Sequence, residues 1–223
     1  MPQHDRNFKK KRLRSFFTIQ EKKPQYSDTL EEIENQLINL GMIYLQMNLP
    51  VDSITPTFED KIRSQIDNEI NTIKILRAKE NDLKTILHLY NLAWSSTHTP
   101  LSVMTLDALK EIYEFPETIF FLARYHGMAA GFIILDFEGD NNEFGIIAGL
   151  GVLPQYQKKK IGTLLGLKAW EFFKENGVSE LRCEVYMENK GSYEFIKSLG
   201  FKEYGQKTYR LDDFFLKYET DSD

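Results

Sequence analysis

The stretch IIAGLGVLPQYQKKKIGTLLGLKAWEFFKE, residues 146–175, decides the fold of this chain. Residues 146–152 form an unbroken apolar run, which predicts a strand covered on both faces. Pro154 ends that strand, because proline has no amide proton to donate to a sheet. Apolar side chains then recur at helical spacing, at positions 161, 164, 165, 169, 172 and 173. Gly177 fits the left-handed position that follows a helix. The stretch therefore predicts a strand, a polar loop and a helix over 161–176.

The loop between this strand and this helix has the chemistry of an anion site. The first amides of a helix have no partner within the helix, and they carry the positive end of its dipole. Gly162 allows an anion to approach the backbone closely, and Thr163 adds a hydroxyl group. Lys158, Lys159 and Lys160 add three positive charges. These residues predict a cradle for a pyrophosphate, and the alternative is a solvated loop without a ligand.

Two blocks of sequence resemble the GNAT superfamily of N-acetyltransferases. The block VLPQYQKKKIGTLL, residues 152–165, is similar to the family's acyl-CoA loop, with matches at Val152, Pro154, Gln157 and Gly162. The block LRCEVYMENKGSYEFIKSLGFKEYG, residues 181–205, resembles the family's strand–Asn–helix–Gly-Phe segment, with matches at Asn189, Ser192, Leu199, Gly200 and Phe201. The two blocks stand at the separation found in the family, and the resemblance covers residues 73–218.

The resemblance implies that the co-substrate is acetyl-CoA. It places the pyrophosphate on the amides of residues 157–163, and the pantetheine arm in a gap between the strands at 145–152 and 180–187. A backbone amide near 150–152 would polarise the thioester carbonyl and hold the oxyanion. The residues implied for this site are Leu150, Gly151, Val152, Gln157, Lys158, Lys159, Lys160, Ile161, Gly162, Thr163, Asn189 and Ser192. Asn189 has a second interpretation, as the cap of the helix that follows it.

Glu184 is the first candidate for the base that removes a proton from the acceptor amine. It alternates with apolar residues in the strand LRCEV, and partial desolvation would raise its pKa toward a useful range. The resemblance points the same way, since some family members that acetylate protein N-termini carry a glutamate at this position. The alternative is an ion pair with Arg182 or with a lysine at the strand edge. Glu143, at the start of the central strand, is the second candidate.

Two positions depart from the family's pattern. Lys160 stands where the first motif glycine is expected, and we expect it to be tolerated if its φ is negative. Many members carry a tyrosine, as the acid for the leaving thiolate, four residues before the glycine of the Gly-Phe pair, where this chain has Ile196. Tyr193 is the substitute acid or else a core aromatic. Tyr186 and Tyr209 are further candidates for substrate contact, with core packing as the alternative.

Composition limits the class of protein. The chain has 223 residues, 42% hydrophobic and 27% charged, as in a soluble globular protein. No apolar run is long enough to span a membrane, and the basic N-terminus is not followed by the apolar stretch of a secretory signal. A single cysteine, Cys183, excludes a disulfide framework and suits the cytoplasm. Cysteine and histidine are too few for a zinc site, so we expect no metal.

The N-terminal part of the chain is expected to differ from the rest. Residues 1–26 form a basic arm. Residues 1–23 contain eight Lys and Arg against Asp5 and Glu21, a net charge of +6. Since the whole chain has a net charge of −5, the remainder carries −5 − 6 = −11. The arm could contact protein, nucleic acid or an anionic membrane, or it could be a solvated tail. A helical extension over 27–71 should contain one helix from Ser27 or Asp28 to about Met47, a linker at 50–58, and a second helix at 59–71.

Residues 72–218 are expected to form a GNAT-like acyltransferase domain, followed by an acidic tail at 219–223. The order of elements, β-α-α-β-β-β-α-β-α-β-β, predicts an α/β (α+β) fold with a mixed, mostly antiparallel sheet flanked by helices. His126-Gly127 is the turn of a hairpin. The expected strands are 72–78, 119–126, 129–136, 145–152, 180–187 and a pair near 201–217, and the expected helices are 80–95, 105–114, 161–176 and 190–199.

These observations predict an N-acyltransferase that moves an acetyl group from acetyl-CoA to a primary amine of a protein, peptide or small molecule. Direct attack is expected, because Cys183 lies in a core strand. The loop at 93–105, with Trp94, His98 and Met104, would lie near the acceptor, and His98 is a base or merely exposed. One alternative is a catalytically weakened acyl-CoA sensor or interaction protein. Another is nucleic-acid binding through residues 6–23, and a homodimer is also considered.

Overall fold

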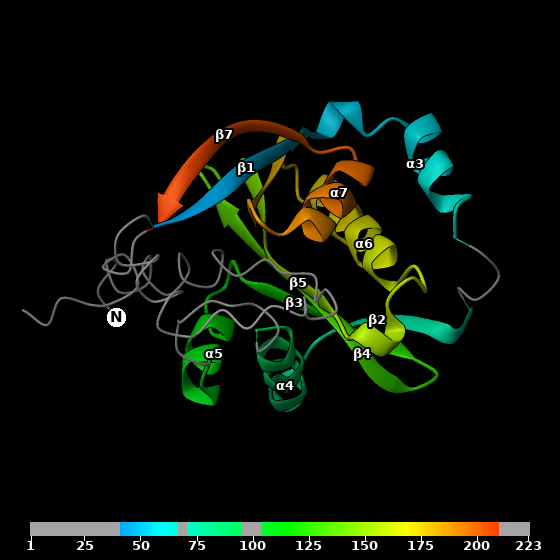
Figure 1. Cartoon of the computed structure of the whole chain (residues 1–223), viewed down its shortest axis with the longest axis vertical. Coiled ribbons are helices and arrows are strands. Elements are labelled where there is room, and N and C mark those ends of the chain that lie inside the picture. The colour runs from blue at the N-terminus through cyan, green and yellow to red at the C-terminus, as the bar shows by residue number, and fades with distance from the viewer. Residues whose placement is uncertain (1–40, 67–70, 95–103, 210–223) are drawn as a thin grey trace, which may run out of the picture.

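The computed structural model describes residues 41–66, 71–94 and 104–209, which form a seven-stranded sheet with helices on both faces (Figure 1). The strands are β1 (Met42–Pro50), β2 (Ile73–Arg77), β3 (Ile119–Tyr125), β4 (Met128–Glu138), β5 (Phe144–Val152), β6 (Glu180–Tyr186) and β7 (Lys202–Tyr209). The helices are α3 (Pro56–Arg63), α4 (Leu83–Trp94), α5 (Leu106–Tyr113), α6 (Ile161–Glu175) and α7 (Lys190–Ser198). Short 3-10 turns are η1 (Val51–Ser53), η3 (Glu80–Asp82) and η4 (Pro154–Tyr156).

The strands lie in the order β2-β3-β4-β5-β6-β1-β7. Each neighbouring pair is antiparallel except β5 and β6, which run parallel because α6 crosses between them. The mixed, mostly antiparallel sheet predicted from the sequence is therefore confirmed. The β3–β4 hairpin turns at His126-Gly127, where φ values of 48° and 81° match a two-residue turn with both central residues left-handed.

The strand, loop and helix of residues 146–175 form as predicted. β5 is buried from Gly145 to Val152, and Pro154 opens η4 directly after the strand. Helix α6 ends at Glu175, and Gly177 has a φ of 71°, the left-handed conformation expected past a helix end. The elements expected over 72–200 each appear within a few residues of their predicted bounds.

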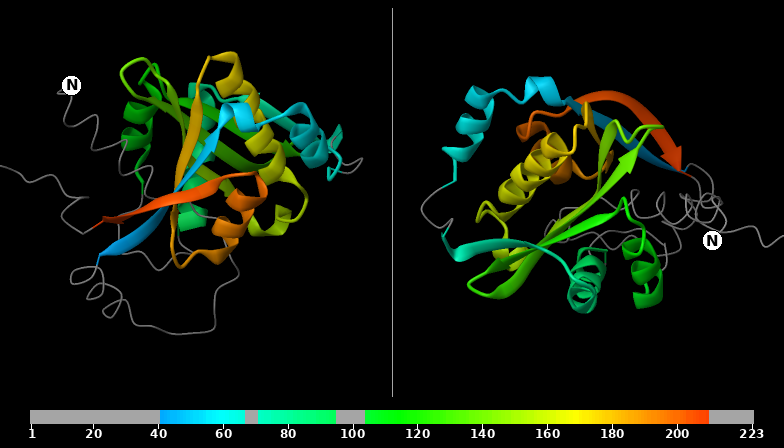
Figure 2. Two further views of the ribbon diagram at one scale, coloured as in Figure 1. Left: turned by 90° about the horizontal axis from the view of Figure 1, so that it is seen from above. Right: turned by 180° about the vertical axis from the view of Figure 1, so that it is seen from behind.

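The helices divide the core into two layers, one on each face of the sheet (Figure 2). α4 and α5 cover one face, where Leu83 and Leu109 are fully buried. α6 and α7 cover the other face, and α3 packs on that side as well. A Cβ on Gly166 of α6 would lie 2.7 Å from Leu199 Cδ1, so the close approach of α6 to the end of α7 requires glycine there.

The prediction of a helix up to Met47 is wrong over 42–47, because residues 42–50 are a strand. These residues form strand β1, which lies between β6 and β7 and is antiparallel to both. Its side chains are buried on both faces of the sheet, Tyr44 in the α4–α5 layer and Leu49 in the α6–α7 layer. A strand covered on both faces shows no clean alternation of apolar and polar residues. Residues 42–50, assigned to a helical extension, therefore belong to the main sheet.

The remaining segments agree in part with expectation. The second N-terminal helix begins earlier than predicted, at Pro56, where Thr55 Oγ1 accepts a hydrogen bond of 3.2 Å from the Phe58 amide. The expected linker at 50–58 accordingly contains η1 and the start of α3. One strand of the pair expected near 201–217 is β7. The other strand, the arm at 1–26, the helix start at 27–40 and the tail at 219–223 lie outside the described residues.

We expect Met47→Ala to lower the free energy of unfolding by about 3 kcal/mol, because it opens a cavity in the middle of β1. Met47 is fully buried between Cys183 of β6 and Glu203 of β7. Urea denaturation measures the change. Lys202→Ala, on the exposed surface of β7, is the control and should stay within about 0.5 kcal/mol of the original chain. Equal stabilities for the two variants would contradict the placement of β1.

Candidate functional site

β5 and β6 pair at one end only and then separate. Their parallel ladder holds three residue pairs, the last of them Ile146 with Arg182. Beyond that pair no ladder joins residues 147–152 to residues 183–186, whereas β6 stays paired with β1 along its whole length. The sheet is therefore open in its middle, which confirms the gap that was expected between these two strands.

Backbone amides of β5 point into this opening. The amide of Leu153 donates to the carbonyl of Ala130 in β4 at 2.9 Å. Amides alternate in direction along a strand, so those of Val152 and Leu150 point away from β4 and toward the opening. A shift in the β4–β5 register leaves Ala148 without an opposite residue, and this β-bulge bends β5 beside the gap. Donors in the interior of a sheet need partners, and an amide-rich extended ligand supplies them.

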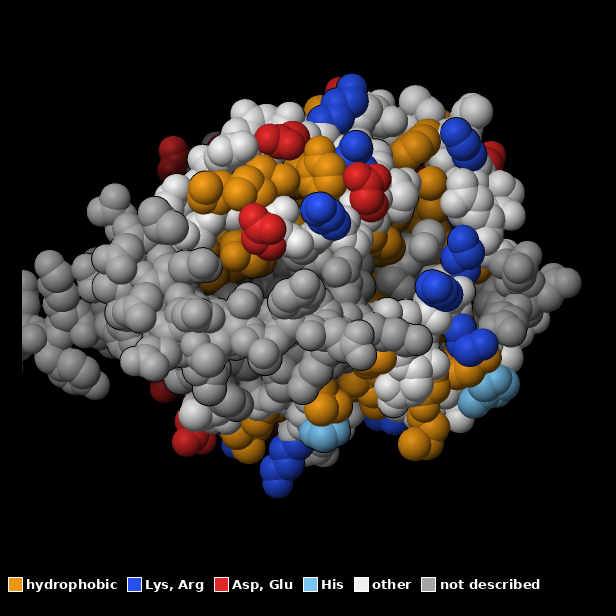
Figure 3. All heavy atoms as spheres, in the orientation of Figure 1, with side chains coloured by type: hydrophobic (Ala, Val, Ile, Leu, Met, Phe, Trp, Pro, Cys, Tyr) orange, Lys and Arg blue, Asp and Glu red, His pale blue; other side chains and the backbone are white. Residues whose placement is uncertain are grey.

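A cavity of about 470 Å³ adjoins the opening at the start of α6. Several Lys and Arg side chains are visible around a hollow on the same face of the molecule in Figure 3. The predicted acyl-CoA residues that line the cavity are Leu150, Val152, Gln157, Lys158, Lys160, Ile161, Gly162 and Thr163. The other lining residues were not predicted to belong to the acyl-CoA site. They are Ile62, Gln65, Tyr156, Phe195, Ser198 and Leu199.

The start of α6 presents hydrogen-bond donors to this cavity. The first bond within the helix runs from the Leu164 amide to the Lys160 carbonyl at 3.0 Å, so the amides of residues 161–163 precede it. The Lys160 side chain does not cap the helix. These amides lie beside Lys158 and Lys160, which line the same cavity, and the anion cradle predicted for them stays a prediction. Lys159 is turned away, with Nζ 5.4 Å from the centre of the Tyr125 ring.

Lys160 does not meet the condition of a negative φ under which its side chain was expected to be tolerated. Its φ is 61° and its ψ 10°, in the left-handed region, and Lys158 has a φ of 62°. A side chain with a Cβ costs about 1–2 kcal/mol in this conformation, whereas glycine adopts it freely. The loop therefore keeps a glycine-like shape although it carries lysine, and the cost is borne by the stability of the fold.

Two glycines of the predicted site serve packing. A Cβ on Gly162 would lie 3.1 Å from Phe195 Cζ, so this glycine lets α6 approach an aromatic ring that also lines the cavity. A Cβ on Gly151 would lie 2.6 Å from Phe132 Cε1 on the opposite face, and Gly151 is not part of the cavity lining. A Cβ at 162 would therefore be tight against the Phe195 ring, which would have to move by a few tenths of an ångström.

Asn189 and Ser192 shape the helix beside the cavity. Asn189 Oδ1 accepts a hydrogen bond of 2.9 Å from the Ser192 amide, so the capping interpretation of Asn189 is confirmed. Ser192 is fully buried, and neither residue lines the cavity. Their contact with pantetheine stays a prediction.

Glu184 lies on the wall of the opening, two residues beyond the last β5–β6 pair. Its neighbours Cys183 and Val185 point into the α6–α7 layer, so the Glu184 side chain points to the opposite face, toward the α4–α5 layer. The carboxylate accepts a short hydrogen bond from the Tyr209 hydroxyl. It also lies 3.5 Å from Gln46 Nε2. The cavity therefore lies on the α6–α7 face of the sheet, whereas the Glu184 carboxylate lies on the α4–α5 face.

The ion pair considered as an alternative role for Glu184 is present. Its partner is a lysine of the edge strand β7 and not Arg182. Lys207 Nζ lies 3.6 Å from Glu184 Oε1. Arg182 instead pairs with Glu180 and lies over the Phe144 ring at 3.5 Å. The Glu184 carboxylate is held by β1 and β7 and is 16% exposed.

A group of tyrosines surrounds this carboxylate. The Tyr44 ring lies 5.5 Å from Tyr186 and 5.3 Å from Tyr209, so the packing role considered for the latter two is present. Burial, and then the neighbouring Tyr186, Tyr90 and Glu184, raise the pKa of Tyr44 well above its usual value. Burial also raises the pKa of Tyr186. Both phenols stay protonated at neutral pH. Sequence reasoning missed Tyr44 and Gln46, because it placed them in a helix.

Comparisons with known proteins identify the family. The sequence model of the acetyltransferase (GNAT) family matches residues 83–201, more than half of the chain. The chain belongs to this family. It is 29% identical over 165 residues to an uncharacterized N-acetyltransferase of Methanocaldococcus jannaschii, covering 69% of this chain and 73% of that protein. The GNAT assignment also agrees with the solved structures that resemble the fold.

Two such structures are aminoglycoside acetyltransferases. One, meta-AAC0020 from an uncultured soil metagenomic sample, is in complex with sisomicin; it has a TM-score of 0.51 and 20% identity, over 58% of this chain and 88% of that one. The other, AAC(6')-Iy in complex with CoA, has a TM-score of 0.50 and 19% identity, over 62% of this chain and 91% of that one. At these identities the likeness shows the fold that this GNAT chain shares with them.

The second candidate base, Glu143, lies far from the opening. It precedes β5, at the end of the strand opposite to Val152, and its carboxylate accepts a hydrogen bond of 3.0 Å from the Asn141 amide. Backbone hydrogen bonds, from its own amide and then from Asn141, lower the pKa of Glu143. A depressed pKa and a turn-forming contact disfavour Glu143 as the base.

The other residues considered for catalysis have structural contacts or fall outside the described residues. Tyr193 donates a hydrogen bond of 3.4 Å to Glu203, and Ile196 is fully buried in the α6–α7 layer. Met104 is buried, its amide and carbonyl both bonded to the Asn91 side chain. His98 and the side chain of Trp94 lie outside the described residues. Tyr193 as the acid therefore stays a prediction.

Two further findings concern metals and membranes. In the described part of the chain, no three His, Cys, Asp or Glu side chains lie close enough together to hold a metal ion. In the same residues, no helix has both the length and the apolar character needed to cross a bilayer.

Lys160→Gly is expected to raise the free energy of unfolding by about 1 kcal/mol, because it removes the cost of a left-handed lysine. Lys159→Gly is the matched control. Lys159 is not among the described residues with positive φ, so glycine there should lower stability by up to about 1 kcal/mol. Urea denaturation distinguishes the two changes. A loss of stability in both variants would show that Lys160 carries no backbone strain.

Proposed function

We propose that this chain is an N-acetyltransferase that moves an acetyl group from acetyl-CoA to a primary amine. The observation that carries the proposal is the opening between β5 and β6, which meets a cavity lined by the first residues of α6. A pyrophosphate suits the amides of residues 161–163. The pantetheine arm is an extended chain with amide groups, and it suits the unpaired edge of β5. The likeness of the fold to that of a CoA-bound acetyltransferase supports the same placement.

The proposed chemistry is direct attack. The acceptor nitrogen attacks the thioester carbonyl, the C–N bond forms, and the C–S bond breaks to release the CoA thiolate. The amides of Leu150 and Val152 stabilise the oxyanion, since they point into the opening. Glu184 takes the proton that the amine loses, directly or through one water.

A covalent intermediate on the enzyme is disfavoured by the state of Cys183. Its side chain is buried in the α6–α7 layer. Burial, and then the charge of Glu184, raise the pKa of the thiol far above its usual value. A protonated, buried thiol is a poor nucleophile. The free thiol also supports a cytoplasmic location.

The acceptor is proposed to approach from the face covered by α4 and α5. Glu184 points to that face, and the net charge of −5 favours a cationic substrate. Amines of proteins, peptides and small molecules all satisfy this chemistry, and the sisomicin complex of a structural neighbour supports the inclusion of aminoglycosides among the candidates. Dimer formation and contacts of the basic arm stay predictions.

Isothermal titration with acetyl-CoA and with CoA, followed by a screen of amine acceptors, tests the proposal. The screen should include sisomicin, polyamines and short peptides with free N-termini. Micromolar binding together with transfer to one class of amine is the expected result. Binding without transfer would favour the alternative of an acyl-CoA sensor, for which the buried Ile196 in place of a tyrosine is the supporting observation. Absence of binding to either ligand would refute the acyl-CoA site.

Gly162→Asp is expected to weaken CoA binding at least tenfold, because it places a carboxylate at the start of α6 beside the bound pyrophosphate. Gly162→Ala is the matched control, because it adds a side-chain carbon at the same place without adding a charge. Its Cβ would press on the terminal atoms of the Phe195 ring at 3.1 Å, and the ring can move. The alanine variant should bind CoA within about threefold of the original chain. Equal affinity in both variants would place the phosphates elsewhere.

Glu184→Gln is expected to lower kcat/KM for the amine at least about a hundredfold, because glutamine cannot accept the proton. The dissociation constant for acetyl-CoA should not change, since Glu184 faces away from the cavity. Glu180→Gln is the control on the same face of β6, where the β5–β6 ladder is still closed. Steady-state kinetics should show a loss of less than about threefold for it. A comparable loss in both variants would assign Glu184 a structural role.

A further inference from the structure

Helix α3 lies beside the candidate cofactor cavity although it is outside the residues that match the family. The match begins at residue 83, whereas α3 spans Pro56–Arg63 in the connection between β1 and β2. Ile62 of α3 and Gln65 just after it nevertheless line the cavity together with Thr163 and Ser198. Ile62 is 4% exposed and Gln65 is exposed. A segment outside the family match therefore forms part of the wall.

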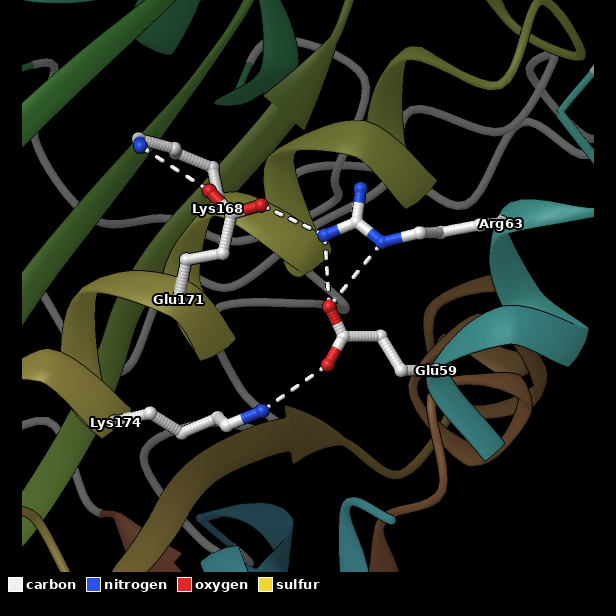
Figure 4. Close-up of polar contacts among 5 residues, drawn as sticks. All are labelled: Glu59, Arg63, Lys168, Glu171 and Lys174. Atoms are coloured by element: carbon white, nitrogen blue, oxygen red, sulfur yellow. Dashed lines mark hydrogen bonds and ion pairs between the residues drawn. The ribbon is translucent and has the colours of Figure 1, made fainter. Parts of the chain in front are cut away.

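Charged side chains hold α3 on α6 (Figure 4). Arg63 lies 2.7 Å from Glu59 of its own helix and 2.7 Å from Glu171 of α6. Lys174 bonds Glu59 at 3.0 Å, and Lys168 bonds Glu171 at 3.2 Å. Hydrogen bonds from Arg63, and then from Lys174, lower the pKa of Glu59. A single exposed ion pair adds little stability, but this network shares its charges across two helices.

Apolar contacts beneath this network fix the same arrangement. The Phe58 ring stacks on Trp170 of α6, with centroids 5.7 Å apart and planes at 29°. A Cβ on Gly200, whose φ is 90°, would lie 2.8 Å from the Phe58 ring, so the turn after α7 is also shaped around α3. Ile66 packs on the same core. The position of Gln65 at the cavity is therefore set by contacts on both α6 and α7.

The position of α3 defines which part of a ligand it can reach. In the proposed function, on which this inference rests, the pyrophosphate binds at residues 161–163 and the pantetheine arm continues along Leu150 into the opening. The nucleotide is attached to the other side of the pyrophosphate. It must occupy the part of the cavity that lies away from β5, and Ile62, Gln65 and Ser198 line the cavity without belonging to β5 or to the start of α6.

We propose that α3 and Gln65 form a binding wall for the adenosine 3′-phosphate end of CoA. Ile62 offers an apolar surface for the purine ring. The Gln65 amide can donate and accept hydrogen bonds with the base or the ribose phosphate. Lys158 and Lys160, on the same cavity, balance the charge of the phosphates.

Gln65→Glu tests this wall, because it places a negative charge at the side chain that should meet the nucleotide. Affinities are measured by isothermal titration for CoA and for 4′-phosphopantetheine, which lacks the nucleotide. We expect the variant to bind CoA about threefold to tenfold more weakly, and 4′-phosphopantetheine less than twofold more weakly. Gln206→Glu, the same change at an exposed position of β7, should alter neither affinity.

Hydrogen exchange gives a second readout that does not depend on a variant. Saturating CoA should slow exchange of the α3 amides at least about threefold, and 4′-phosphopantetheine should not. If the original chain binds CoA but Gln65→Glu leaves its affinity unchanged, the α3 wall is refuted and the proposed function stands. Equal losses for both ligands would also refute the wall. If the original chain does not bind CoA, the proposed function fails and this inference fails with it.

Discussion

The short ladder between β5 and β6 is the constraint on which the rest of the structure depends. Hydrogen bonding joins these strands over three pairs and then stops, although both strands continue. Interior strand edges without partners are costly, so the surroundings must either supply a partner or keep the edges apart. Helix α6 starts at the wide end of the opening, and its free amides extend the same set of donors. One interruption of the sheet thus creates the opening, and the cavity adjoins it at the start of α6.

Strand β1 supports β6, which borders the opening and is paired with β5 at one end only. It pairs with β6 from Tyr44 to Pro50 and with β7 over nearly the same residues, so β6 is anchored on its far edge. It also brings Gln46 to the Glu184 carboxylate and Tyr44 to the tyrosines around it. Strand β1 is therefore a structural part of the Glu184 surroundings on the α4–α5 face, and α3, which follows it, packs on the opposite face.

Sequence reasoning predicted those parts whose signals are local. Pro154, Gly177 and the His126-Gly127 turn end their elements wherever they occur, so the order of strands and helices after residue 72 was read correctly. β1 was misread because its partners lie more than a hundred residues away and both its faces are buried. For the same reason the contributions of Ile62 and Gln65 to the cavity carried no signal, as they arise from tertiary packing. The left-handed φ of Lys160 could not be read from the sequence, because residue type alone favours a negative value.

The place of β1 in the sheet has a consequence for biosynthesis. During translation this strand leaves the ribosome before its neighbour β6, which begins about 130 residues later, and at about 5–20 residues per second the wait lasts roughly ten seconds. An apolar strand with both edges unpaired is prone to associate with other chains in that interval. Pairings of such long sequence separation also slow folding. The strand that supports β6 is thus made early and paired late, and its edges stay open to association with other chains until β6 is made.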